Sequence, residues 1–286
     1  MTDVSTEEFT SNRHVATSGA KVRRRPSLAV TIGLAILVLY VFVAVFAPVL
    51  APQNPLKQDT LNRLASPSGG HLLGTDELGR DVLSRLIYAT RTDLPIGVLA
   101  ALLPAVLGTL IGVVAGYRGG WLDGFVMRVA DLFQAFPSYV LVIVLVFALG
   151  QGTASILIAF TLLGWLVYAR LIRSEVLRVR ESGYVLAAQL AGVPTWRIVL
   201  FHVLPNVIPQ TLVYLPSDIV FATLALASFS FLGLGVPPPT PEWGAMIAEG
   251  QRHLRDQWWL STVPGIVIMV FGVGLSLVGE WLEERL

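Results

Sequence analysis

Long stretches without any charged residue constrain the fold of this chain more than any other feature. No Asp, Glu, Lys or Arg occurs between Asp131 and Arg170, and none occurs from Leu94 to Tyr117. A helix needs about 20 residues to cross about 30 Å of hydrocarbon, so the longer stretch predicts two spans and the shorter stretch one. Because 54% of the residues are hydrophobic and only 14% are charged, the composition also predicts an integral membrane protein.

Six transmembrane helices are expected in all. The other three apolar segments are 28–47, 206–226 and 260–279, and Pro137 is placed to kink the third span. Of the 20 Lys and Arg residues, 13 fall in the N-terminal tail, the loops on the same side and the C-terminus. The positive-inside rule then places both termini in the cytoplasm. The sequence thus predicts an all-α integral membrane protein.

The expected domain boundaries follow these spans. Residues 1–27 are polar and end in a basic cluster, which indicates a disordered cytoplasmic tail. A signal peptide is the alternative, but the apolar segment that follows has full span length and favours an uncleaved helix. We expect the first transmembrane helix at 28–50, an extracytoplasmic segment with an amphipathic helix at 51–93, and a five-helix core at 94–283 with a cytoplasmic loop at 174–205.

Glycines recur along the second span. Gly97, Gly108, Gly112 and Gly116 fall largely at four-residue spacing, which lets helices approach closely. The pattern fits either a homodimer contact or packing within one bundle.

Charged residues gather just before the second span. Asp76, Glu77, Arg80 and Asp81 lie close together in the sequence, and the cluster taken alone suggests a metal site or acid–base chemistry. Exposed ion pairs between residues three or four apart are far more common. We therefore expect exposed ion pairs here, with Arg80, Asp81 and Arg85 on the polar face of the amphipathic helix.

The cytoplasmic loop contains a hairpin that is unlike a solvated loop. Gln189 is the only polar residue between Leu186 and Ala191, whereas a surface helix should show one polar face. Gly192 and Pro194 break this helix, and a second short helix is expected at 195–203, ending at Pro205. Its exposed apolar surface indicates a docking element for another protein. An interfacial segment lying on lipid is the open alternative.

One acidic residue lies inside the fifth span. Asp218 is about 18 Å from the start of that helix, close to the bilayer centre. A carboxylate there costs about 2.5–3.5 kcal/mol on insertion scales, so it should face water, a partner or a hydrogen-bonding group. Two roles stay open: a position on the translocation path, or a structural contact with a neighbouring helix.

The sequence contains none of the motifs that would indicate an active site in this chain. The chain has no GxxxxGK[ST] phosphate loop, no HExxH and no cysteine. Ser228 and Ser230 lack a histidine base on a neighbouring span, which disfavours an intramembrane protease. We therefore expect a non-catalytic chain that binds no metal and no nucleic acid.

The hairpin resembles the cytoplasmic loop of the membrane subunits of ATP-binding-cassette importers. Ala187, Ala188, Gly192, Leu204 and Pro205 fall in register with the pattern of that family. The resemblance implies that the hairpin docks into a cleft of an ATPase subunit.

The sequence departs from the family pattern at two positions of this hairpin. Leu186 stands where the family has an acid, and His202 stands at an aliphatic position. The bulky anchors of the implied contact would be Leu186, Leu190 and Trp196.

Two further motifs point to one branch of that family. Segment 74–85 resembles the region before the core in the peptide-type importers, and segment 229–244 resembles the end of the fifth span in peptide and nickel permeases. Leu226 replaces an acid that this branch usually carries. The implied fold is that of a type I importer permease, of the C-type subunit in dipeptide, oligopeptide and nickel uptake.

The resemblance also implies partners and a location. They are a paralogous permease forming a heterodimer, two ATPase subunits that use ATP and magnesium, and an extracytoplasmic substrate-binding protein, in the plasma membrane of a bacterium. Peptides are the expected substrate, with nickel or another small solute as the alternative. A secondary transporter is the alternative of another class, and it would show repeated halves and ionisable pairs.

Overall fold

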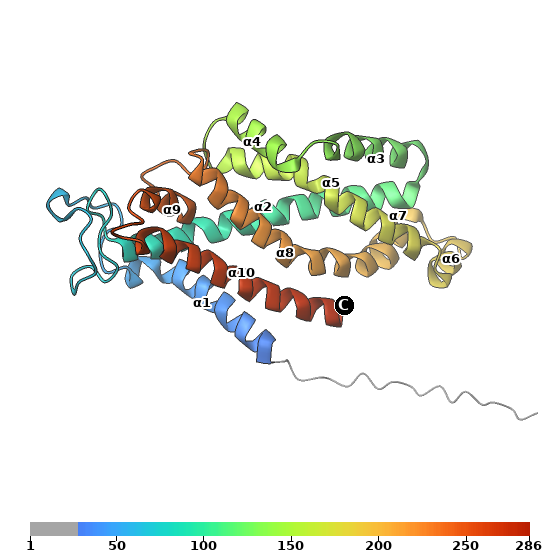
Figure 1. The fold of residues 1–286 in the computed structure, drawn as a ribbon. Helices are drawn as coiled ribbons and strands as arrows, with labels where there is room; N and C mark the ends of the chain where they lie inside the picture. The colour runs from blue at the N-terminus through green and yellow to red at the C-terminus, as the bar shows by residue number, and fades with distance from the viewer. Residues whose placement is uncertain (1–27) are drawn as a thin grey trace, which may run out of the picture.

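The computed structural model describes residues 28–286 and is helical, with no β-strand in that part of the chain (Figure 1). The tail expected at 1–27 lies outside the described residues. The elements are α1 (Leu28–Leu50), η1 (Thr60–Asn62), α2 (Val82–Arg118), α3 (Gly120–Gln134), α4 (Ser138–Leu149), α5 (Thr153–Arg180), α6 (Gly183–Leu190), α7 (Thr195–Ile198), η2 (Val199–Val203), α8 (Leu204–Phe231), α9 (Trp243–Gln251) and α10 (Trp259–Arg285). The all-α prediction is confirmed.

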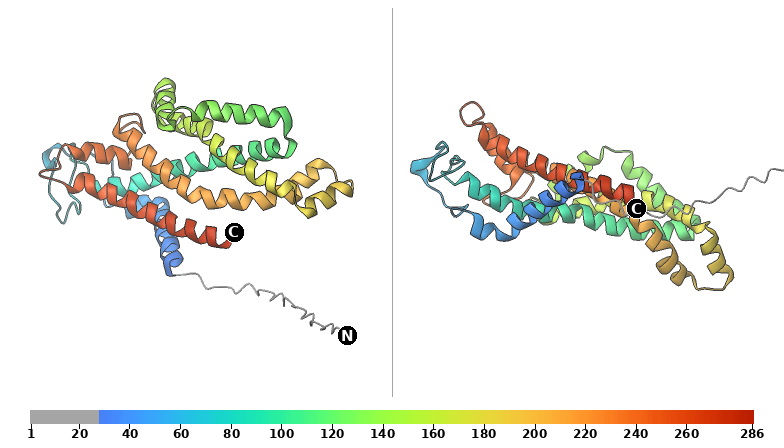
Figure 2. Two further views of the ribbon diagram at one scale, coloured as in Figure 1. Left: turned by 45° about the vertical axis from the view of Figure 1, so that its right-hand side comes forward. Right: turned by 90° about the horizontal axis from the view of Figure 1, so that it is seen from below.

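The long helices lie side by side as one bundle with two different ends (Figures 1 and 2). Segment 51–81 and α9 form one end, and α6 and α7 form the other. Within the described chain, α1, α2, α5, the run Thr195–Phe231 and α10 are long and apolar enough to cross a membrane. The number of spans therefore agrees with the expected six only when α3 and α4 count as one.

The pair α3 and α4 is bent by 87°. α4 has 12 residues, which make about 18 Å of helix and are too few to cross a membrane alone. Pro137 stands at the N-cap of α4 and marks the bend, as expected of a residue without an N–H group. α3 begins at Gly120, directly after the end of α2 at Arg118.

Glycines of α2 let it approach α5 closely. A Cβ atom added to Gly108 would lie 2.4 Å from the Trp165 carbonyl oxygen, and one added to Gly112 would lie 2.6 Å from the Ala169 carbonyl oxygen. Small residues at this spacing allow such contacts between membrane helices. The glycine pattern therefore serves packing within this chain.

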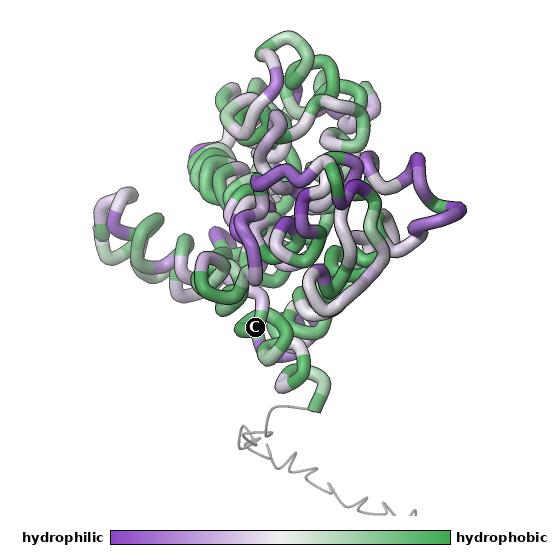
Figure 3. Tube along the Cα trace, turned by 90° about the vertical axis from the view of Figure 1, so that its left-hand side faces the viewer, coloured by the Kyte–Doolittle hydropathy of each residue, from purple (hydrophilic) through white to green (hydrophobic). Residues whose placement is uncertain are grey.

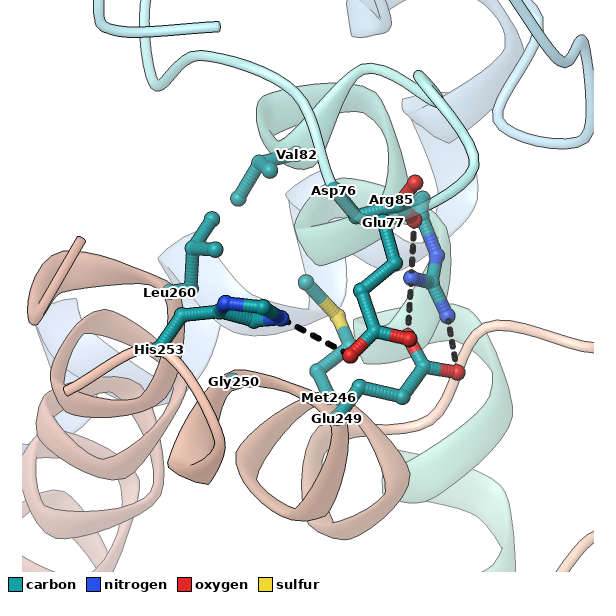
Figure 4. Close-up of a pocket in the computed structure, with 9 residues that line it drawn as sticks. All are labelled: Asp76, Glu77, Val82, Arg85, Met246, Glu249, Gly250, His253 and Leu260. Atoms are coloured by element: carbon teal, nitrogen blue, oxygen red, sulfur yellow. Dashed lines mark hydrogen bonds and ion pairs between the residues drawn. The ribbon is translucent and has the colours of Figure 1, made fainter. Parts of the chain in front are cut away.

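A buried ionic network closes the end formed by segment 51–81 and α9. Figure 3 looks onto this end, where polar loops lie over apolar helices, and Figure 4 shows most of the network. Arg85 is 2% exposed and donates to Asp76 Oδ2 and to Glu249 Oε2, each at 2.5 Å. Arg80 donates to the same two oxygens, at 2.7 and 3.1 Å.

The expectation of exposed ion pairs is therefore wrong. Asp76, Arg80 and Arg85 are buried because α9 brings Glu249 over them from far along the chain. The amphipathic helix is also not a separate element, because α2 runs without a break from Val82 to Arg118. Asp81, also buried, caps that helix by accepting from the backbone N–H of Ser84.

Helix α9 lies between α8 and α10 in the sequence and contacts both of them. Trp243 is 1% exposed, and its backbone N–H donates to Asp93 Oδ2 of α2 at 2.8 Å. Burial raises the pKa of the Glu242 carboxyl, which caps α9 by accepting from the N–H groups of Gly244 and Ala245. A Cβ on Gly244 would lie 2.3 Å from the Ala227 carbonyl oxygen, so only glycine lets α9 reach α8.

The close contact between α2 and α5 predicts that Gly112→Ala destabilises the protein. The added methyl group meets a carbonyl oxygen of α5, and overpacking of this kind costs about 1–3 kcal/mol. Gly265→Ala is the matched control, because this glycine of α10 has no atom within 4 Å of an added Cβ. Thermal unfolding of the detergent-solubilised protein should show a lower midpoint for Gly112→Ala alone. Equal midpoints for the two variants would contradict the packing.

The buried network predicts a large loss of stability for Arg85→Met. Removing one partner leaves buried charges without compensation, which costs about 3–5 kcal/mol. The control is Arg178→Met, because Arg178 is 77% exposed in its ion pair with Glu175 and such pairs contribute about 1 kcal/mol or less. Chemical denaturation of both variants measures the difference. A loss for Arg85→Met no larger than for the control would show that the network does not hold this end together.

Candidate functional site

The hairpin formed by α6 and α7 is built around a glycine with left-handed backbone conformation. Helix α6 ends at Leu190, and Gly192 follows with a φ of +75°. The Gly192 N–H donates to the Gln189 carbonyl, and the Val193 N–H donates to the Ala188 carbonyl. This pair of hydrogen bonds is a Schellman motif, which favours glycine at the position with positive φ. The structure therefore confirms the predicted helix break at Gly192.

The inner face of the hairpin is held against the bundle. Val185, Ile198 and Val203 are buried in an apolar cluster with residues of α2 and α5. Gln189, the polar residue of α6, donates from Nε2 to the Tyr117 hydroxyl at the end of α2. The hairpin is thus fixed to the end of two long helices.

The outer face of the hairpin is apolar and exposed. Leu186 is 46% exposed, Leu190 is 90% exposed and Trp196 is 57% exposed. Ala187 is also exposed, whereas Ala188 is half-buried. Figure 2 shows the hairpin projecting beyond the long helices. The three predicted anchors therefore share one exposed element, although their contact with an ATPase stays a prediction.

The second helix of the hairpin does not end at Pro205. α7 continues through the π-helical turn Val199–Val203 into α8, so the chain is helical from Thr195 to Phe231. Pro205 lies in the first turn of α8, where a missing N–H costs little. Leu204 is half-buried against the same apolar cluster. The second helix of the hairpin and the fifth span are consequently one continuous helix.

Asp218 lies halfway along α8 and borders a cavity of about 310 Å³. Its Oδ2 accepts a hydrogen bond from the Tyr168 hydroxyl of α5 at 3.0 Å. The wall of the cavity also includes Tyr139, Tyr214 and Phe221. Both roles left open for Asp218 are therefore compatible with the structure: it contacts a neighbouring helix, and it faces a cavity.

Sequence reasoning missed the residues that accompany Asp218. The tyrosines come from α4, α5 and α8, and an apolar span gives no pattern that singles out one aromatic residue from another. Among the described residues, no group of three His, Cys, Asp or Glu is placed to hold a metal ion.

Two family models match the chain. Residues 108–286, which include the hairpin and Asp218, match the binding-protein-dependent transport system inner membrane component. Residues 25–67 match the N-terminal transmembrane domain of oligopeptide transport permease C.

Relatives named as peptide permeases align over most of the chain. The dipeptide transport system permease protein DppC of Alkalihalophilus pseudofirmus is 35% identical over 93% of this chain and 87% of its own length. The oligopeptide transport system permease protein OppC of Bacillus subtilis is 37% identical over 93% of this chain and 88% of its own. The probable D,D-dipeptide permease DdpC of Escherichia coli is 35% identical over 88% and 84%.

A solved structure shares the fold. A chain of the methionine ABC transporter MetNI, in an inward-facing conformation, aligns with a TM-score of 0.57 and 15% identity over 70% of this chain and 95% of that one. The resemblance stated from the hairpin and the two branch motifs is thus confirmed. Because the family model covers more than half of the residues and the relatives align over nearly all of them, the chain belongs to the family of binding-protein-dependent transport system inner membrane components.

Proposed function

We propose that this chain is the transmembrane pathway subunit of an ATP-driven importer for peptides. The relatives reported above are named as dipeptide and oligopeptide permeases, which supports peptides as the substrate class. The chain itself carries no phosphate loop for ATP. ATP and magnesium are therefore used by two ATPase subunits on the cytoplasmic side, and this subunit is not an enzyme.

The single observation that carries the proposal is the exposed apolar face of the hairpin. Leu190 is 90% exposed to solvent. An apolar residue so exposed on a fixed helix is typical of a surface that a partner covers. Leu186 and Trp196 lie on the same hairpin, and together they supply the bulky anchors that a protein contact needs. The partner is the ATPase subunit.

Continuity of the helix explains how movement of the ATPase reaches the transport path. From Thr195 the chain runs as helix through the π-helical turn to Asp218 and on to Phe231. Packed helices move as rigid bodies when an interface shifts, and π-helical turns occur often at functional sites. Closure of the ATPases on ATP would thus displace α8 and switch the cavity between outward and inward access.

The remaining partners are those that the family resemblance implies. An extracytoplasmic substrate-binding protein delivers peptide at the end formed by segment 51–81 and α9. A paralogous permease completes the pathway as a heterodimer, within the plasma membrane of a bacterium. We expect both termini of the chain in the cytoplasm, as the distribution of Lys and Arg predicts.

Reconstitution tests the proposed function directly. The full transporter in proteoliposomes should take up a radiolabelled dipeptide only when ATP and the binding protein are both supplied. Uptake by this chain alone, driven by an ion gradient without ATP, would assign it to the secondary transporters and overturn the proposal.

The docking face predicts that Leu190→Asp separates the chain from its ATPase. A charged side chain cannot enter an apolar contact without losing its hydration, so association should weaken about tenfold or more. The control is Leu61→Asp at the other end of the molecule, where Leu61 is 93% exposed. Pull-down from detergent extracts should recover the ATPase with the control and not with Leu190→Asp. Equal recovery would mean that the hairpin is not the docking element.

A further inference from the structure

The cavity beside Asp218 has an unusual composition for the middle of a membrane protein. Its wall contains one carboxylate and two serine hydroxyls, and no Lys, Arg or His of the described chain lines it. The aromatic residues of the wall are three tyrosines and three phenylalanines: Tyr139, Tyr168, Tyr214, Phe160, Phe221 and Phe229. The cavity is therefore acidic and aromatic.

The carboxylate of Asp218 is only partly satisfied by this chain. The Tyr168 hydroxyl supplies its one hydrogen bond, and Asp218 forms no ion pair within residues 28–286. A neutral phenol stabilises a carboxylate but does not cancel its charge. An acidic residue at this depth ordinarily pairs with a cation or lines a path for one.

The aromatic rings beside Asp218 offer further groups that attract a cation. Tyr168 and Tyr214 meet edge to face with their ring centroids 5.3 Å apart, and Tyr139 packs beside Phe221 in the same way at 6.0 Å. The face of such a ring attracts an ammonium group, most strongly where water is excluded. Tyr214 and Phe221 are partly exposed, so the cavity opens at the surface of this subunit.

From this arrangement we propose that the Asp218 cavity binds the protonated amino group of the solute as it crosses the membrane. The carboxylate supplies the countercharge, and the tyrosine rings surround the ammonium group. This inference rests on the proposed function, because peptides carry a free ammonium at their N-terminus. It extends that function by assigning the part of the substrate that the permease recognises.

The negative potential of the cavity can be measured with charged thiol reagents. The chain contains no cysteine, so Ser217→Cys places its only thiol in the cavity wall. In the assembled transporter, cationic 2-aminoethyl methanethiosulfonate and a neutral methyl analogue are compared by their reaction rates. The ratio of the two rates cancels any effect of Asp218 on the reactivity of the thiol itself.

The expected result is a fall in this ratio of about tenfold when Asp218→Asn is added, because a nearby full charge is removed. Asp218→Glu should restore the ratio, since it keeps the charge. A ratio that Asp218→Asn leaves unchanged would mean that the carboxylate is protonated or paired with a basic residue of the partner permease. Either of these states overturns the proposal.

Protection of the same thiol tests the chemistry of the ligand. Without the binding protein, a dipeptide with a free N-terminus should slow labelling of the cysteine, and its N-acetylated form should not. Asp218→Asn should abolish the difference. Equal protection by both peptides would exclude recognition of the ammonium group.

The proposed function and this inference fail in different experiments. Peptide uptake by the unmodified transporter without any need for ATP would contradict the proposed function. ATP-dependent uptake by the unmodified transporter, with labelling that ignores Asp218, would contradict the ammonium site alone. Co-purification of the ATPase with each variant confirms that the complex has assembled before labelling is compared.

Discussion

The close approach of α2 to α5 is the contact on which the rest of the molecule depends. Carbonyl oxygens of α5 stand where any side chain larger than glycine would project from Gly108 or Gly112. The same contact positions Tyr168 of α5, because the Tyr168 Cβ atom lies beside Gly108. Since the Tyr168 hydroxyl donates to Asp218, the contact also decides where the hydrogen-bond partner of Asp218 lies. At its far end, Arg180 of α5 donates to the last carbonyls of α2, while Tyr117 of α2 receives the Gln189 side chain of the hairpin. One helix pair thereby positions both candidate functional elements.

The two ends of the bundle differ in which side chains they bury and which they expose. At the end that carries α9, charged groups are buried and bonded to one another, which demands accurate geometry because an uncompensated charge in that place is costly. At the other end, bulky apolar groups are held in the open on a hairpin that ends in a Schellman turn. The buried ionic network holds its end of the bundle rigid, whereas the exposed apolar side chains of the hairpin suit contact with a partner protein. Between them, one continuous helix passes the cavity of Asp218.

The sequence was sufficient for the elements whose chemistry is local. Span length and the absence of charge predicted the membrane helices, because a helix in lipid must satisfy its own backbone and present apolar side chains. The hairpin was predictable for a similar reason. Gly192 and Pro194 act on the backbone within a few residues, and Gln189 is conspicuous among apolar neighbours.

Only the tertiary structure decided what the charged and aromatic residues do. Asp76, Arg80 and Arg85 have the spacing of surface ion pairs, and Glu249 turns them into a buried network from a distant part of the chain. Tyr168 and Asp218 are likewise on separate spans, so no local pattern could pair them. The physical reason is the same in both cases. Residue type and periodicity fix the kind of helix that forms, whereas contacts between helices depend on which faces the close-packed bundle brings together.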